Sequence, residues 1–137
     1  MGTSNLSIAR FLLVISIAFG LFSWWQTIIH VGDESYTFLT YRYGKYHAWV
    51  HAFREAFYDI GIMAIFAMIL FGNASWRTVA TWKLAFVLMF FYYVPSWVGG
   101  LIYPQLKFPN ITATLVHVGM IVPAFLALFI SKKEFYK

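Results

Sequence analysis

The chain has 137 residues, of which 61% are hydrophobic and 11% charged, and its net charge is +5. A soluble domain carries about 25% charged residues, so this composition excludes an ordinary water-soluble fold and indicates a membrane protein of one domain. There is no cysteine, which excludes disulfides and thiolate metal sites. The positive charges form no continuous block, so we interpret them as a signal for membrane orientation and predict no nucleic-acid binding.

Four segments are long and apolar enough to cross a bilayer core of about 30 Å, which requires about 20 residues of helix. In chain order they cover residues 8–30, 47–72, 81–103 and 111–130. The lengths disfavour strands, because every backbone group in lipid must bond within its own segment. The sequence therefore predicts an all-α, four-helix transmembrane bundle that forms a single domain over residues 1–137.

Turn-forming residues mark the connections between these segments. Residues 72–75 close the second helix, and Pro104 and Pro109 bracket the third connection. The first connection, residues 31–46, is the longest, and its tyrosines favour a position on the outer membrane interface. These tyrosines are Tyr36, Tyr41, Tyr43 and Tyr46.

Basic residues are divided unequally between the two ends of the predicted bundle. One end has six of them: Arg10, Arg77, Lys83, Lys132, Lys133 and Lys137. The other end has three basic residues, diluted by two acids: Arg42, Lys45 and Lys107, with Asp33 and Glu34. Because lysine and arginine accumulate in cytoplasmic loops, we predict that both termini and the second connection are cytoplasmic.

The second helix carries the most informative pattern, because ionisable residues recur along it at a spacing of four. This spacing keeps neighbours on one face of a helix, with a drift of about 40° per step. A rise of about 1.5 Å per residue, counted from Phe71, places Asp59 about 18 Å above the cytoplasmic boundary and inside the hydrocarbon. The residues of the pattern are His47, His51, Glu55 and Asp59, with Arg54 and Tyr58 beside them.

The other three helices offer polar side chains at the same depth. Similar counting places each of them about 17–23 Å from the cytoplasmic boundary. An ionised carboxylate in lipid costs several kcal/mol unless it is paired or protonated, so we expect Glu55 and Asp59 to face the bundle interior. We also expect Pro95 and Pro123 to open space beside these groups. The predicted ligand-binding residues are Gln26, Arg54, Tyr58, Tyr93, Ser96 and His117.

Three interpretations of this cluster stay open. As a metal site, His51, Glu55, Asp59 and His117 would supply mixed nitrogen and oxygen ligands suited to a divalent metal such as Zn, Fe, Mn or Cu(II). Haem is a further possibility, with His51 and His117 as axial ligands. Alternatively, Arg54 pairs with Asp59 or Glu55, and His51 with Glu55, in a network that fixes the register of the helices.

The layout of the chain invites comparison with two kinds of small four-helix membrane protein. Small multidrug transporters carry their key glutamate in the first helix, where this chain has none. The order of elements resembles the sterol-isomerase and sigma-2-receptor type, in which an acid lies near the outer start of the second helix. A short basic loop and a last helix with a proline before a lysine-rich tail follow in that type. The similarity covers this layout and no specific motif. The residues at the corresponding places in this chain are Glu55, Arg77, Pro123, Lys132 and Lys133.

We expect the polar cluster to make the protein a ligand-, metal- or proton-binding module or an accessory subunit of a larger membrane complex. Its partners would be the lipid bilayer and other membrane subunits or further copies of the chain. An alternative is a membrane enzyme acting on a lipophilic substrate, with Glu55 or Asp59 as acid or base and His51 or His117 as its partner. The single short bundle disfavours a third interpretation, a proton-coupled transporter.

Overall fold

A computed structural model of the protein describes residues 4–37, 44 and 46–137. These residues form helices and turns and include no strand, which confirms the prediction of an all-α chain. The long helices are α1 (Asn5–Ile28), α2 (His47–Phe71), α3 (Val79–Ile102) and α4 (Ile111–Ile130). The short ones are η1 (Ala74–Trp76), η2 (Pro104–Leu106) and α5 (Lys132–Phe135).

Polar side chains set the starts of three long helices. The side-chain oxygens of Ser4, Thr78 and Asn110 each accept a hydrogen bond from a backbone N–H in the first turn of α1, α3 and α4. Such caps satisfy donors that have no partner within the helix. The cap at Ser4 explains why α1 begins three residues before the predicted start at residue 8.

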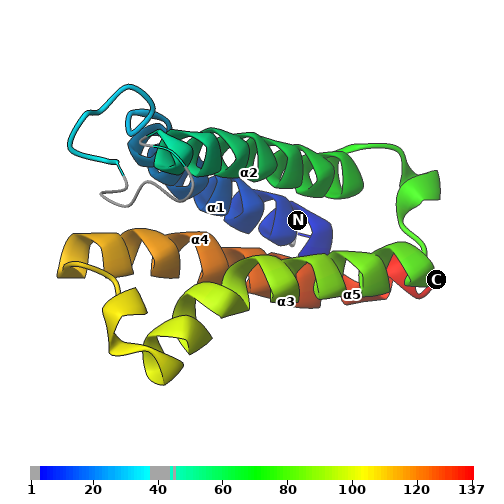
Figure 1. The fold of residues 1–137 in the computed structure, drawn as a ribbon. Coiled ribbons are helices and arrows are strands. Elements are labelled where there is room, and N and C mark those ends of the chain that lie inside the picture. Colours follow the sequence, from blue (N-terminus) through cyan, green and yellow to red (C-terminus); the bar gives the residue numbers. More distant parts are fainter. Residues whose placement is uncertain (1–3, 38–43, 45) are drawn as a thin grey trace.

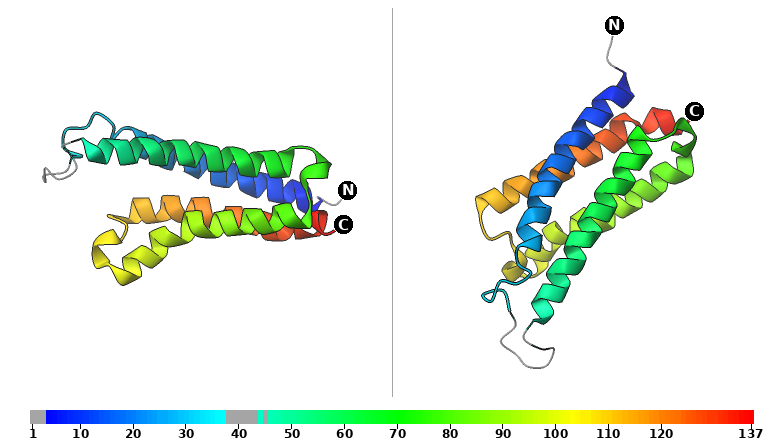
Figure 2. Two further views of the ribbon diagram at one scale, coloured as in Figure 1. Left: turned by 45° about the vertical axis from the view of Figure 1, so that its right-hand side comes forward. Right: turned by 90° about the horizontal axis from the view of Figure 1, so that it is seen from above.

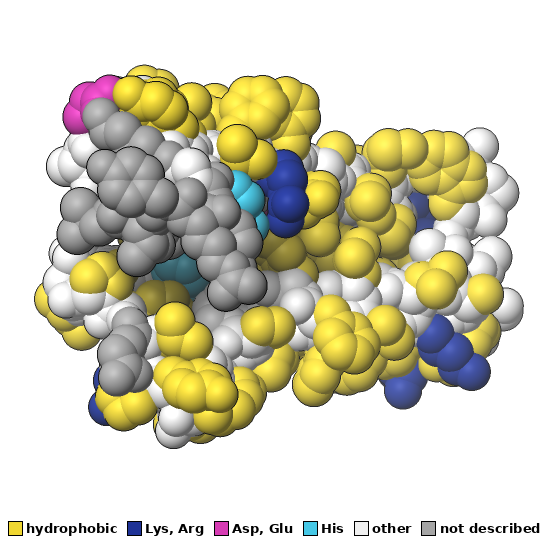
Figure 3. Space-filling model, in the orientation of Figure 1, with side chains coloured by type: hydrophobic (Ala, Val, Ile, Leu, Met, Phe, Trp, Pro, Cys, Tyr) yellow, Lys and Arg dark blue, Asp and Glu magenta, His cyan; other side chains and the backbone are white. Residues whose placement is uncertain are grey.

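Three of the described helices, α1, α3 and α4, are long and apolar enough to cross a membrane. The fourth, α2, has 25 residues, but every stretch of it long enough to span contains Arg54, Glu55 and Asp59. Hydrophobic side chains cover much of the molecular face seen in Figure 3. Such a surface suits a lipid environment, so the position of the three charges decides whether α2 can share it.

The four long helices form two layers (Figures 1 and 2). One layer holds α1 and α2 and the other holds α3 and α4, and both termini lie at the same end. The most extensive contact is between α1 and α4, and α1 also packs along α2. Toward its C-terminal end, the ribbon of α3 diverges from that of α4.

The buried face of α2 follows a regular repeat. Its buried residues are separated alternately by four and three positions from Ala52 onward, the spacing with which helices pack side by side. Alanines fill the first half of this seam. Asp59 occupies a position at which the repeat calls for an apolar side chain. The seam consists of Ala48, Ala52, Ala56, Asp59, Met63, Phe66 and Leu70.

Small residues allow α1 and α4 to approach each other closely. A Cβ atom at Gly119 would lie 2.6 Å from Cγ of Phe19, so the absence of a side chain on α4 makes room for this ring. Nearby, the Ser16 hydroxyl donates a 2.6 Å hydrogen bond to the backbone carbonyl of Met120. Small residues and interhelical hydrogen bonds are typical of helix packing in membranes.

Two arginines cap the C-terminal end of α2, near the chain termini. Arg10 Nε donates to the carbonyl of Leu70 at 2.8 Å, and Arg77 Nη1 donates to the carbonyl of Gly72 at 3.1 Å. The carbonyls at the end of a helix have no partner within it and carry partial negative charge. The two cations therefore stabilise this end of α2 and concentrate positive charge beside it.

The described part of the first connection is attached to α2 by Trp49, whose Nε1 donates a 2.9 Å hydrogen bond to the carbonyl of Asp33. The rings of His30 and Tyr36 stack at 4.2 Å. Hydrogen bonds from the side chain and backbone of Ser35 lower the pKa of the Asp33 carboxyl, so this acid is ionised at neutral pH. Four residues used in the sequence analysis lie outside the described part of the chain: Tyr41, Arg42, Tyr43 and Lys45.

Candidate functional site

The candidate site is centred on Asp59, which lies in the middle of the α2 seam and is only 5% exposed. The hydroxyl of Tyr92, on α3, donates a hydrogen bond to Asp59 Oδ1. This bond joins the two helical layers where α2 and α3 otherwise make few contacts. A hydrogen bond to a carboxylate is stronger than one between neutral groups, so the bond offsets part of the cost of burying the acid.

Three further groups interact electrostatically with Asp59: Glu55, Tyr93 and His117. Tyr93 is buried, and its ring meets the Tyr92 ring edge to face at 4.7 Å. His117 is half-buried, and its ring centroid lies 4.3 Å from that of Phe108. Its Nδ1 atom lies 2.8 Å from the carbonyl oxygen of Ala113. Because a carbonyl only accepts, Nδ1 carries the hydrogen of this bond.

The prediction that both acids of α2 face the bundle interior agrees with the position of Asp59 and is wrong for Glu55, whose side chain is exposed. The cause is the drift of about 40° for each step of four residues along a helix. From Asp59, this drift turns Glu55 and then His51 out of the seam, and alanines take their place. Arg54 lies still further round, on the opposite face of α2.

The predicted metal site of His51, Glu55, Asp59 and His117 is not formed. Within residues 4–37, 44 and 46–137, no three His, Asp or Glu side chains are gathered as metal ligands. His51 Nε2 instead lies 2.9 Å from His47 Nε2, on the exposed side of α2. His51 and His117, the two histidines considered as axial haem ligands, each make a separate local contact.

The predicted ion pairs are likewise not observed in the described part of the chain. Neither Arg54 nor His51 is paired with Glu55, and Arg54 is not paired with Asp59. The partner of Asp59 is the Tyr92 hydroxyl. The neutral Tyr92 hydroxyl of α3 is thus bonded to Asp59 where an ion pair with Arg54 of α2 is one of the predicted alternatives.

Of the remaining predicted ligand-binding residues, Tyr93 and His117 interact electrostatically with Asp59. Tyr58 is 60% exposed, and Gln26 is exposed near the end of α1. Ser96 is exposed as well and lines a separate hollow nearer the end of α3. Depth alone placed these side chains at one level, whereas their directions round each helix separate them.

Tyr92 is the residue that sequence reasoning missed. The predicted ligand-binding residues include Tyr93 and do not include its neighbour Tyr92. Adjacent residues on a helix point about 100° apart, so at most one of two neighbouring tyrosines can point straight into a given interface. Here Tyr93 points toward α4 and Tyr92 toward α2, and the pair thereby links the acid to the space between α3 and α4.

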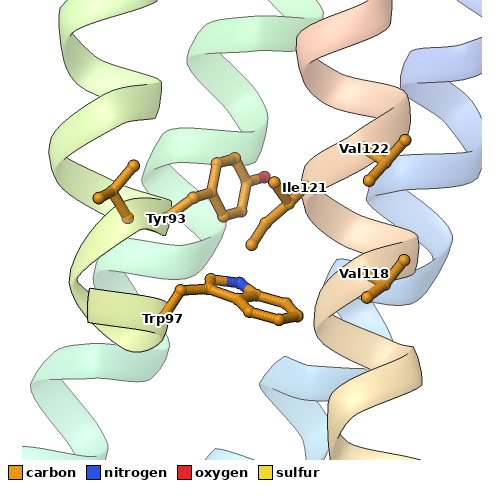
Figure 4. A pocket seen from close by; sticks show the side chains of 6 residues that line it. Tyr93, Trp97, Val118, Ile121 and Val122 are labelled. Atoms are coloured by element: carbon orange, nitrogen blue, oxygen red, sulfur yellow. The ribbon is translucent and has the colours of Figure 1, made fainter. Parts of the chain in front are cut away.

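An apolar cavity of about 270 Å³ lies between α3 and α4. The Tyr93 and Trp97 side chains extend into it from α3, opposite apolar side chains of α4 (Figure 4). A second hollow, of about 290 Å³, continues from Trp97 toward the end of α3 and includes Ser96, Lys107 and Thr114. The first cavity is lined by Tyr93, Val94, Trp97, Val118, Ile121 and Val122.

Comparison of the chain with protein-family models, with curated proteins and with solved structures found no match. The chemistry of the described side chains is accordingly the basis for assigning a function. That chemistry combines a buried carboxylate, two tyrosines that connect it to an apolar cavity, and Lys107 at the second hollow.

Proposed function

We propose that the chain is a four-span membrane protein with cytoplasmic termini that binds a lipophilic ligand between α3 and α4. The charges of α2 are compatible with a span. Counted from Phe71, Arg54 and Glu55 lie about 24–26 Å up the helix, where exposed charged side chains can reach the headgroups. Asp59 lies deeper, at about 18 Å, and it is the one of the three charges that the fold buries.

The orientation can be tested at the C-terminus. We expect a reporter that works only in the cytoplasm to be active when fused after Lys137, because six basic residues lie at the end that holds both termini. A second reporter, active only outside the cytoplasm, serves as the control at the same position. Activity of this second reporter alone would overturn the proposed orientation.

The position of the Asp59–Tyr92 pair beside an apolar cavity is the observation that carries the ligand proposal. Membrane helices contain buried acids rarely, and mostly where they serve a ligand, an ion or a proton. The cavity is lined by apolar and aromatic side chains and reaches a hollow that contains Lys107. Each hollow approaches the lower end of the range of about 300–1,000 Å³ typical of small-molecule sites, and they share Trp97.

The shape of this space defines the class of ligand. An apolar body would lie against Tyr93 and Ile121, deep between the helices, and a polar or anionic head would lie near Lys107. In the described residues no carboxylate lines the cavity, and Asp59 contacts Tyr92 instead. The proposal is therefore a binding module, in preference to an enzyme that uses Asp59 or Glu55 as its acid or base.

Filling the cavity should abolish ligand binding without unfolding the protein. We expect Ile121→Trp to remove a co-purifying lipophilic molecule, because the indole would occupy much of the 270 Å³ between α3 and α4. Native mass spectrometry of protein extracted in mild detergent would measure the bound mass. The matched control is Leu126→Trp, which adds the same ring to an exposed position of α4. Equal ligand occupancy in both variants, or no bound ligand in the wild type, would contradict the proposal.

A further inference from the structure

We propose that His47 and His51 form a binding site for a divalent transition metal with tetragonal geometry, such as Cu(II) or Ni(II). The two Nε2 atoms lie 2.9 Å apart, and the rings meet edge to face with their centroids 4.6 Å apart. Both side chains project from the first turns of α2. This site is separate from Asp59 and does not depend on the proposed ligand.

The spacing of the two nitrogens favours some metal geometries over others. Histidines four residues apart lie on one face of a helix, as in the paired metal ligands of the H-E-x-x-H pattern. With metal–nitrogen bonds of about 2.0–2.1 Å, a separation of 2.9 Å gives an angle of about 90° at the metal. That angle matches neighbouring positions of a square-planar or octahedral ion. A tetrahedral zinc ion would require the nitrogens to move to about 3.3 Å apart.

The pair already shares one hydrogen, which must move when a metal binds. At 2.9 Å, one Nε2–H donates to the lone pair of the other Nε2. A metal needs both lone pairs, so the donor ring must carry its hydrogen on Nδ1 instead. This tautomer change needs no net loss of a proton, because the hydrogen moves from one nitrogen of the ring to the other.

The location supplies water for the remaining coordination positions. Counted from Phe71, His51 lies about 30 Å and His47 about 36 Å along α2, at and beyond the edge of the hydrocarbon. The His51 side chain is exposed and borders a hollow of about 190 Å³. The hollow is also lined by Ser35, Tyr36, Thr37 and Ala48. Water can therefore complete the coordination of an ion held by the two rings.

Copper titration of the full chain in detergent tests this site. We expect one Cu(II) per chain, and an electron paramagnetic resonance spectrum with hyperfine coupling to two imidazole nitrogens. Removing one of two ligands should weaken binding about tenfold or more, so His47→Gln and His51→Gln should each show this loss. His30→Gln is the matched control, because it removes a histidine outside the pair and should leave the affinity unchanged.

Thermal unfolding separates metal loss from misfolding. Without metal, His51→Gln should melt close to the wild type, because the substituted side chain is exposed. Copper should raise the melting temperature of the wild type and of His30→Gln, and should leave that of His51→Gln unchanged. Copper affinity that survives in both His47→Gln and His51→Gln, or that falls equally in His30→Gln, would overturn the proposal. So would a wild-type spectrum with no coupled nitrogen.

Discussion

Tyr92→Phe is expected to destabilise the protein by about 1–3 kcal/mol, because it leaves the buried Asp59 carboxyl without its hydrogen-bond donor. The change removes a single oxygen atom and keeps the packing of the ring. Reversible unfolding in mixed detergent micelles would measure the loss. Tyr58→Phe is the matched control, since it removes the same oxygen from an exposed tyrosine of α2 and should have little effect.

Companion variants identify the partner of Asp59. Asp59→Asn keeps an oxygen that can accept from Tyr92, so its free energy of unfolding should change less than that of Tyr92→Phe. Replacing both partners with apolar groups, as in Asp59→Leu with Tyr92→Phe, should recover much of the stability, because no buried polar atom then lacks a partner. If Arg54→Met destabilises the protein as much as Tyr92→Phe, the assigned pairing is incorrect.

The positions of the helices could be predicted because hydrophobic length and turn residues determine them locally. The helix that contains Asp59 was expected to begin at residue 47, and α2 begins at His47. Depth along a helix also follows directly from its constant rise, which placed Asp59, Tyr93 and His117 at one level. In the structure Tyr93 and His117 each interact electrostatically with Asp59.

The direction of each side chain could not be obtained in the same way. A spacing of four approximates the 3.6-residue turn but accumulates a drift, so it grouped Glu55 and His51 with Asp59 although both are exposed. The repeat of alanines at Ala48, Ala52 and Ala56 was the better guide to the packed face. That guide becomes decisive only when the neighbouring helix is known, because lipid accepts an apolar face as readily as a helix does.

The identity of the donor to Asp59 depends on how the layers are arranged. Tyr92 and Tyr93 are adjacent and have the same side chain. Only the positions of α2 and α4 around α3 decide that Tyr92 bonds to the acid and Tyr93 lines the cavity. The most extensive contact between the two layers is that of α1 with α4. The site therefore relies on a contact made by residues outside it.

The close approach of α1 and α4 makes Gly119→Leu the second substitution with a large expected effect. Even the Cβ atom would lie 2.6 Å from Cγ and 2.7 Å from Cδ1 and Cδ2 of Phe19, well inside contact distance. Overpacking of this kind costs about 1–3 kcal/mol. Phe19 is 39% exposed, so its ring can turn outward, but the packing of α1 on α4 is then lost.

A second glycine within a helix provides the control for Gly119→Leu. At Gly61 a Cβ atom would meet nothing within 4 Å beyond its chain neighbours and the backbone of its own helix, so Gly61→Leu should leave stability unchanged or raise it slightly through better helix propensity. Phe19→Ala combined with Gly119→Leu should recover part of the loss, because the leucine then fills the space left by the ring. The free energy of unfolding in mixed micelles distinguishes the three variants. Equal stability of Gly119→Leu and Gly61→Leu would mean that α1 and α4 do not approach each other as closely as described.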